Sequence, residues 1–190
     1  RAAELERHGV TVHLNSYVEP TDVEALAPDV VIVATGGLPD LDWLAGREHV
    51  TDVWEALDRA VPAGGEVVVY DGTGRHAAAT AAERFAMAGR PVAFVAIDDQ
   101  LTPEMNYAER VIWKKRLYEL DLDVTLDHRL VKVETSGNRL RATFRNEVTG
   151  AETERLAEQV IVAHGTVPVD ELYQALAPAA VRSDDGDPAV

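Results

Sequence analysis

The chain has 190 residues, of which 46% are hydrophobic, enough apolar surface for one large domain or two small ones. Its 18 Lys and Arg residues against 33 Asp and Glu residues give a formal net charge of −15, which disfavours binding to the phosphates of DNA or RNA. No apolar run has the length of a membrane span, and the absence of cysteine excludes disulfides and thiolate-bound clusters within these residues, so we expect a cytoplasmic protein without a membrane partner.

The first quarter of the chain predicts short elements that lead to an apolar strand. Residues 1–8 have the pattern of a helix end and residues 10–14 that of a short strand. A short capped helix is expected over residues 21–26. Residues 29–34 are almost continuously apolar, as in a strand buried on both faces of a parallel sheet. The small residues Thr35, Gly36 and Gly37 follow it, and they let a ligand or another backbone approach closely.

The middle of the chain predicts a βαβ unit. Residues 38–50 are expected to cross between two lobes, and Thr51 and Asp52 to cap a helix that runs to about Ala60. A buried strand over residues 67–70 then precedes a small-residue turn, an alanine-rich helix up to Gly89 and a second apolar strand over residues 92–97. This order is that of a Rossmann unit, in which the turn and the helix N-terminus hold a pyrophosphate.

The turn Asp71-Gly72-Thr73-Gly74-Arg75-His76 is therefore the predicted cofactor-binding segment, and its open backbone amides are expected to form a concave anion site. Gly72 and Gly74 would let the pyrophosphate approach, and Arg75 would contact a phosphate. Asp98 ends the second strand close to the expected spacing of about 20 residues, and its carboxylate would bind ribose hydroxyls. Together with Asp99 it favours NAD(H) over NADP(H), because like charges repel a 2′-phosphate.

The glycine pattern of this turn allows two registers. If Gly72 and Gly74 are the first two glycines of the motif, Ala77 takes the third position. If the strand sets the register, Asp71 stands where the first glycine belongs and its carboxylate would repel the pyrophosphate.

The second half of the chain predicts a helix followed by antiparallel strands. A helix is expected from about Pro103 to Leu120, with a basic triplet at residues 114–116 on its solvated side. One face of this helix is expected to carry Ala108, Val111, Ile112 and Tyr118. A meander is then expected, with turns at residues 136–138 and 149–150 and with strands over residues 123–126, 130–134, 140–145 and 158–163. A short helix is expected over residues 171–176, and the tail from Pro178 to Val190 is expected to fray.

The predicted fold class is α/β, with a Rossmann-like parallel sheet, a βαβ unit and an antiparallel β-meander. Neither the six histidines nor any serine stands in a pattern typical of a metal site or a nucleophile, so we predict no metal site and no catalytic residue in this chain.

Two similar segments, residues 31–36 and residues 160–168, each run from an apolar strand into small residues and glycine. They resemble the paired crossings of flavoproteins with two dinucleotide-binding domains. The turn at residues 71–78 resembles more closely the C-terminal half of the trimethylamine dehydrogenase, histamine dehydrogenase and 2,4-dienoyl-CoA reductase group, which are old yellow enzyme-like NADH:flavin oxidoreductases.

The resemblance implies an excised piece of a larger enzyme. Residues 1–50 and 158–190 would be the remnant of an FAD- or ADP-type domain, in which Thr35, Gly36 and Gly165 line an incomplete site. Residues 51–157 would be the inserted NAD(P)H-type domain. FMN and a 4Fe-4S cluster would lie in a barrel domain outside this chain. The implied partners are a dinucleotide, that barrel domain and an electron-transfer flavoprotein.

Two functions stay open at this point. The chain is either the dinucleotide-binding domain of an FMN- and iron–sulfur-dependent NADH:flavin oxidoreductase or amine dehydrogenase, or a non-catalytic scaffold or electron-transfer docking module with a degenerate nucleotide site. A methyltransferase is disfavoured because the antiparallel meander does not fit that fold.

Overall fold

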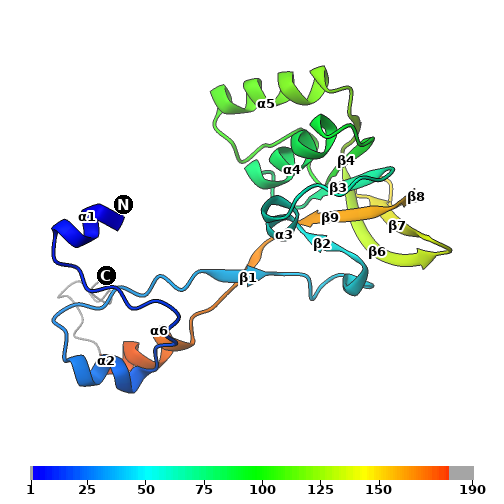
Figure 1. Cartoon of the computed structure of the whole chain (residues 1–190). Helices are drawn as coiled ribbons and strands as arrows, with labels where there is room; N and C mark the ends of the chain where they lie inside the picture. Colours follow the sequence, from blue (N-terminus) through cyan, green and yellow to red (C-terminus); the bar gives the residue numbers. More distant parts are fainter. Residues whose placement is uncertain (1, 180–190) are drawn as a thin grey trace. The chain divides into compact units, whose positions relative to one another are not determined.

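The computed structural model describes residues 2–179, and the chain divides into two compact units. Unit 1 comprises Arg1–Gly37 and Pro168–Val190, and unit 2 comprises Leu38–Val167. Where the chain passes from one unit to the other, β1 (Gly37–Pro39) and β10 (Thr166–Pro168) pair as a two-stranded sheet (Figure 1). The range 51–157, predicted as an inserted domain, lies within unit 2.

Unit 2 is built on a five-stranded parallel sheet with the strand order β2-β9-β3-β4-β5. The strands are β2 (Thr51–Asp52), β3 (Val67–Asp71), β4 (Val92–Ala96), β5 (Asp123–Thr125) and β9 (Gln159–Ala163). The helices of the unit are α3 (Val53–Asp58), α4 (His76–Met87) and α5 (Tyr107–Glu119), and a 3-10 helix, η1 (Arg47–His49), precedes β2. β3, α4 and β4 are the predicted βαβ unit, so the α/β fold class is confirmed.

The central strands β3 and β4 are buried along their whole length because both faces of the sheet are covered, and Asp71 is the one charged residue in them. Val67, Val69 and Phe94 pack in one hydrophobic core with the helices, and the alternate residues Val68 and Tyr70 pack in a second core with the meander. Figure 1 shows the helices on one side of β3 and β4 and strands β6 to β8 on the other. Both faces of the central strands are therefore shielded from water, and polar groups can lie only at the carboxyl edge of these strands.

The alanines of α4 let this helix lie close on the sheet, as predicted. Ala78, Ala81, Ala82 and Phe85 are buried, and the structure adds Ala79 to this face. The predicted cap of α3 is also confirmed, because Oδ1 of Asp52 accepts hydrogen bonds from the backbone N–H groups of Trp54 and Glu55.

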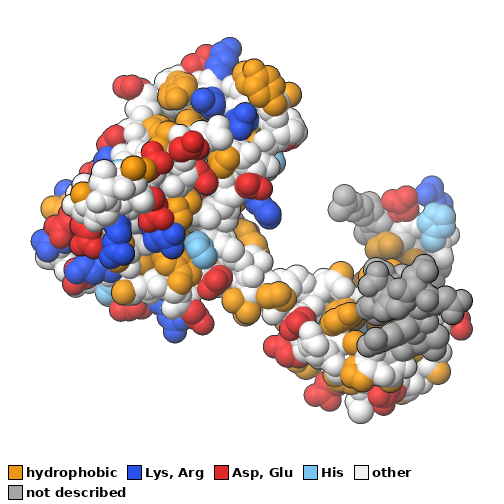
Figure 2. All heavy atoms as spheres, turned by 180° about the vertical axis from the view of Figure 1, so that it is seen from behind, with side chains coloured by type: hydrophobic (Ala, Val, Ile, Leu, Met, Phe, Trp, Pro, Cys, Tyr) orange, Lys and Arg blue, Asp and Glu red, His pale blue; other side chains and the backbone are white. Residues whose placement is uncertain are grey.

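The meander consists of β6 (His128–Ser136), β7 (Arg139–Asn146) and β8 (Glu152–Ala157), all antiparallel. The prediction that residues 123–126 and 158–163 belong to the meander is wrong. Residues 123–125 and 159–163 form strands that pair in parallel within the main sheet. The sequence did not reveal β8, since only Ala157 of this charged strand is buried. Cross-strand pairs such as Arg145 with Glu152, 3.2 Å apart, hold its polar residues, and Figure 2 shows acidic and basic side chains interspersed on one face of the unit.

The buried face of α5 differs from the predicted one. Leu117 is fully buried and Trp113 packs against the same core, whereas Ala108, Val111, Ile112 and Tyr118 are exposed. The helix packs on the rest of unit 2 through this narrow stripe, and its other apolar residues stay exposed. Of the basic triplet, Lys115 and Arg116 lie on the solvated side as predicted, whereas Lys114 is half-buried, and Lys115 pairs with Glu119.

Unit 1 contains α1 (Ala2–Arg7), α2 (Pro20–Leu26), α6 (Glu171–Leu176) and the 3-10 helix η2 (Ala177–Ala179). The strands predicted at residues 10–14 and 29–34 are wrong. Val30 is 68% exposed and Ile32 81% exposed, because the described part of unit 1 offers no neighbouring strand with which they could pair. Of the predicted frayed tail, Pro178 and Ala179 lie in η2, and residues 180–190 lie outside the described residues. Between residues 2 and 179, no helix combines the length and the apolar character needed to cross a membrane.

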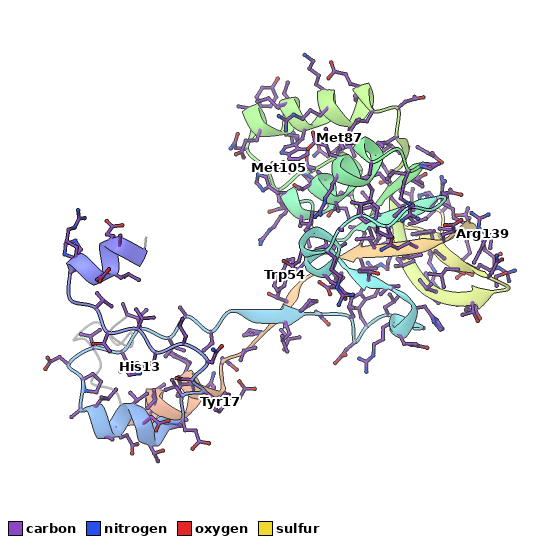
Figure 3. The ribbon with its side chains drawn as sticks, viewed as in Figure 1. His13, Tyr17, Trp54, Met87, Met105 and Arg139 are labelled. Carbon is purple, nitrogen blue, oxygen red and sulfur yellow. The ribbon has the colours of Figure 1, made fainter. Side chains whose placement is uncertain are left out.

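The packing of α4 on the sheet predicts a large stability difference between two positions of the same helix. Phe85→Ala should lower the free energy of unfolding by about 3–5 kcal/mol, because the ring is 1% exposed and its removal leaves a cavity. Met87→Ala is the matched control, because Met87 (labelled in Figure 3) is 74% exposed and its loss should change stability by less than about 0.5 kcal/mol. Urea unfolding of both variants measures this, and equal losses would contradict the packing.

Candidate functional site

The turn between β3 and α4 is organised by the side chain of Asp71. This residue is the last of β3, is 0% exposed, and directs its Oδ1 toward the turn that follows it. Oδ1 accepts hydrogen bonds from the backbone N–H of Thr73 at 3.0 Å, from the Thr73 hydroxyl at 3.1 Å and from the backbone N–H of Gly74 at 2.9 Å. A short polar side chain at a strand end favours such local bonds, because it can reach the amides two and three residues further on.

The neighbouring amides of the turn are also bonded within the protein. Gly72 donates its N–H to the carbonyl oxygen of Ala163 in β9 at 2.8 Å, and Arg75 donates its N–H to the Thr73 hydroxyl at 3.3 Å. All four consecutive amides from residue 72 to residue 75 therefore have protein acceptors. The amides of residues 72–75 therefore do not form the open cradle predicted for the turn, whereas the N-terminus of α4, which begins at His76, has no side-chain cap.

The second oxygen of Asp71 lies in a different environment. Oδ2 is buried and has no hydrogen-bond partner among the described residues. Burial raises the pKa of Asp71, the bonds from Thr73 and Gly74 oppose this shift, and the charge of Asp98 adds to it. The turn thus holds a carboxyl group whose charge is poorly solvated.

The two glycines of the turn are required by packing within the chain. A Cβ atom at Gly72 would lie 2.8 Å from Cδ2 of His164, and a Cβ atom at Gly74 would lie 2.7 Å from Cγ of Pro103. Gly74 also has a φ of 64°, a left-handed conformation that glycine adopts without strain. Its carbonyl oxygen accepts the N–H of Glu104 at 3.1 Å, which ties the loop before α5 to the turn. The small residues make room for neighbouring side chains of this protein.

The remaining predicted residues of the βαβ site lie around this turn. Asp98 is close to it, since its Oδ2 would be 3.2 Å from a Cβ atom at Gly74. Burial, followed by the charges of Asp99 and Glu104, raises the pKa of Asp98. Arg75 is the exposed residue before α4, and His76, the first residue of the helix, places its Nε2 3.7 Å from Glu109 in α5.

The residues predicted to line an FAD- or ADP-type site belong to two different units. In unit 1, the Thr35 hydroxyl donates a hydrogen bond to the carbonyl oxygen of Val169, and the Gly36 carbonyl oxygen accepts the N–H of Val169. In unit 2, the Gly165 carbonyl oxygen accepts the N–H of Asp40 at 2.9 Å. These contacts pair the two connections of the chain with each other.

Sequence reasoning missed two residues that shape the turn, Pro103 and His164. His164 follows β9 at the same sheet edge as Asp71, and its ring packs against that of Trp43 in a tilted arrangement with centroids 4.5 Å apart. Burial lowers the pKa of His164, and the Asp40 carboxylate, 3.9 Å from Nδ1, opposes this shift. Parallel strands that end at one edge could have indicated the proximity of His164, whereas no local signal marks Pro103. Among residues 2–179, no cluster of three His, Cys, Asp or Glu side chains could hold a metal ion.

The chain has close relatives, although no family model matches it. It is 40% identical over 179 residues to a probable N-methylproline demethylase of Rhizobium meliloti (strain 1021). These residues are 94% of this chain and 26% of the relative. It is 40% identical to a multifunctional alkene reductase/demethylase OYE of Caballeronia cordobensis, over 92% of this chain and 26% of that protein. An N,N-dimethylglycine/sarcosine dehydrogenase of Chromohalobacter salexigens is 32% identical over 91% of this chain and 26% of its own length. The chain spans about a quarter of the length of these curated relatives.

Solved structures show the same relationship. The 6-hydroxypseudooxynicotine amine oxidase HisD from Pseudomonas geniculata N1 has a TM-score of 0.74 at 28% identity, over 93% of this chain and 27% of that one. Histamine dehydrogenase from Rhizobium sp. 4-9 also has a TM-score of 0.74, at 21% identity over 90% of this chain and 28% of that one, which shows a shared fold. The resemblance predicted from the sequence is confirmed: this chain is homologous to a segment of the oxidoreductase group that includes these demethylases, dehydrogenases and amine oxidases.

The packing of the turn predicts that Gly74→Ala is more harmful than the same change in another turn. Gly137 has a φ of 63° but nothing within 4 Å of its Cβ position, so Gly137→Ala should cost about 1 kcal/mol from backbone strain alone. Gly74→Ala should cost at least about 1 kcal/mol more, because its Cβ meets Pro103. Denaturant unfolding compares the two, and equal losses would show that the turn is not packed against Pro103.

The raised pKa of Asp71 predicts a pH dependence of stability. Because the folded protein holds this proton to higher pH than the unfolded chain, the contribution is present below the unfolded pKa and is lost as pH rises through the folded pKa. The unfolding free energy of the wild type minus that of Asp71→Asn should therefore fall as pH rises from the ordinary value of 3.8. Urea titrations over a pH series measure this difference, and a difference that rises with pH would refute the assignment.

Proposed function

We propose that this chain forms the Rossmann-type segment of a flavin-dependent oxidoreductase that removes methyl groups from N-methylated amines. The observation that carries the proposal is the 40% identity over 94% of the chain to a protein named as a probable N-methylproline demethylase. A second 40% identical relative is also named as a demethylase, and the third is named as a dehydrogenase of N-methylated glycines. Two of these three relatives are thus named for N-methylated substrates, and the other is named as both an alkene reductase and a demethylase.

The chemistry of such an enzyme would take place outside this segment. A bound flavin would accept two electrons and a proton from the N-methyl group, and water would then release formaldehyde and the demethylated amine. The chain contains no cysteine, so a 4Fe-4S cluster of the kind implied by the resemblance would be bound by another part of the protein. FMN would lie with it in a barrel domain. A barrel domain and an electron-transfer flavoprotein are the partners we propose.

Within this enzyme we assign the segment the role of a scaffold with a degenerate nucleotide site. The amides of residues 72–75 all bond within the protein, which supports the scaffold over a productive dinucleotide site. One observation favours the alternative: Asp98 lies beside Gly74, as the ribose-binding acid of a Rossmann site does, and with Asp99 it would select NAD(H) over NADP(H). Thr35, Gly36 and Gly165 would contact FAD or ADP in that alternative.

An activity assay tests the proposed substrate class. The whole protein that carries this chain, mixed anaerobically with N-methylproline, should lose its visible flavin absorbance and release one formaldehyde per amine consumed. Proline is the matched control, because it lacks the methyl group and should give neither signal. If neither N-methylproline nor N,N-dimethylglycine reduces the flavin, the proposed function is wrong.

A further inference from the structure

We propose that Asp71 is the resident anion of the β3–α4 turn, where its carboxylate takes the hydrogen-bond donors that a Rossmann turn otherwise offers to a phosphate group. The inference rests on the proposed function only in treating the chain as a Rossmann-type segment of an oxidoreductase. It concerns the ligand class of this one turn: phosphoryl anions, nicotinamide dinucleotides included, compete here with a side chain of the protein.

The hydrogen-bond donors of the turn are already bonded within the protein. A dinucleotide pyrophosphate binds to backbone N–H groups of this turn and of the following helix N-terminus. Here Oδ1 of Asp71 already accepts from the N–H groups of Thr73 and Gly74, at 3.0 and 2.9 Å. A carboxylate oxygen resembles a phosphate oxygen in charge and acceptor geometry, so it satisfies the same donors. A ligand that used these two amides would have to break both bonds and leave the buried carboxyl group without them, so that only the uncapped N-terminus of α4 offers donors that Asp71 does not occupy.

The space beside the two glycines of the turn is also filled by the protein. In a Rossmann turn the absent side chain lets the backbone approach the pyrophosphate. Here the space beside Gly72 is taken by His164 and the space beside Gly74 by Pro103, at distances that exclude even a Cβ atom. The close approach that glycine permits is therefore used within the protein.

The charged residues around the turn are mostly acidic. Asp98 and Glu104 face it from the loop after β4, with Asp99 beside them, and Asp71 itself lies at its base. His76, at the start of α4, is oriented to Glu109. The exposed Arg75 is the basic residue of the turn. A pyrophosphate would thus meet more negative than positive charge, which adds repulsion to the loss of donors.

Four forms of the protein test the inference: wild type, Asp71→Ala, Asp71→Asn and Asp99→Ala. Each is titrated with inorganic pyrophosphate and with NADH by calorimetry. In Asp71→Asn the side-chain carbonyl can still accept the two amides, so this variant removes the charge and keeps the turn closed. Asp99→Ala is the matched control, because it removes one nearby exposed carboxylate without touching the turn.

The expected result is weak or no binding by the wild type up to millimolar ligand, and a gain of at least about tenfold in pyrophosphate affinity for Asp71→Ala over both Asp71→Asn and Asp99→Ala. Micromolar binding of NADH by the wild type would overturn the inference. So would equal gains in Asp71→Asn and Asp71→Ala, or no gain in a folded Asp71→Ala protein.

If Asp71→Ala does not fold, the amide resonances of Thr73 and Gly74 in the wild type decide the question. They should stay unmoved in an NMR titration with pyrophosphate, and movement on binding would overturn the inference. The formaldehyde assay is independent of these titrations, so a failure here is distinguishable from a failure of the proposed function.

Discussion

The bonds between the Asp71 carboxylate and the amides of its own turn are the constraint on which the account of this chain depends. The residue stands at the carboxyl end of the central strand, paired on one side with Ala96 of β4 and on the other with Ala163 of β9. A carboxyl group in such a place is costly unless hydrogen bonds compensate it. The turn supplies three donors to one oxygen, and the same donors are thereby withdrawn from any ligand.

The sheet makes this arrangement possible because it is dry on both faces. Tyr70, next to Asp71, packs against the meander, and desolvation raises its pKa to about 12. The alanine face of α4 closes the opposite side. Asp71 therefore has no path to bulk water across either face, and the turn is the nearest source of donors. In this Rossmann-type fold, the carboxylate of Asp71 at the end of β3 thus occupies the position that an anionic ligand would otherwise take.

The sequence predicted those features that depend on local pattern. Continuous apolar runs identified β3 and β4, small residues identified the sheet face of α4, and Asp52 identified the start of α3. Strand β8 was missed, because its charged residues are held by pairs with β7 that no local pattern shows. The strand predicted at residues 29–34 was wrong, because an apolar run becomes a strand only where a neighbour accepts its hydrogen bonds.

The candidate site shows the same division. The proximity of Asp98 to Gly74 follows from the geometry of any βαβ unit and could be predicted. The packing of Pro103 against Gly74 could not, because no local pattern in the sequence marks it, whereas the position of His164 after a strand that ends at the same sheet edge could have been inferred. The sequence did raise the question of Asp71, since it allowed a register with a carboxylate in the first-glycine position. Which way that side chain turns is decided by the burial of the strand end, which the sequence alone does not show.

Amide hydrogen exchange of Thr73 and Gly74 tests the central claim most directly. The account predicts that both amides of the wild-type protein exchange slowly, with protection like that of β3, and that Asp71→Ala abolishes this protection while Asp71→Asn keeps it. Exchange of the wild-type amides at the rate of an unprotected loop would contradict it, because the turn would then be free to bind a phosphate.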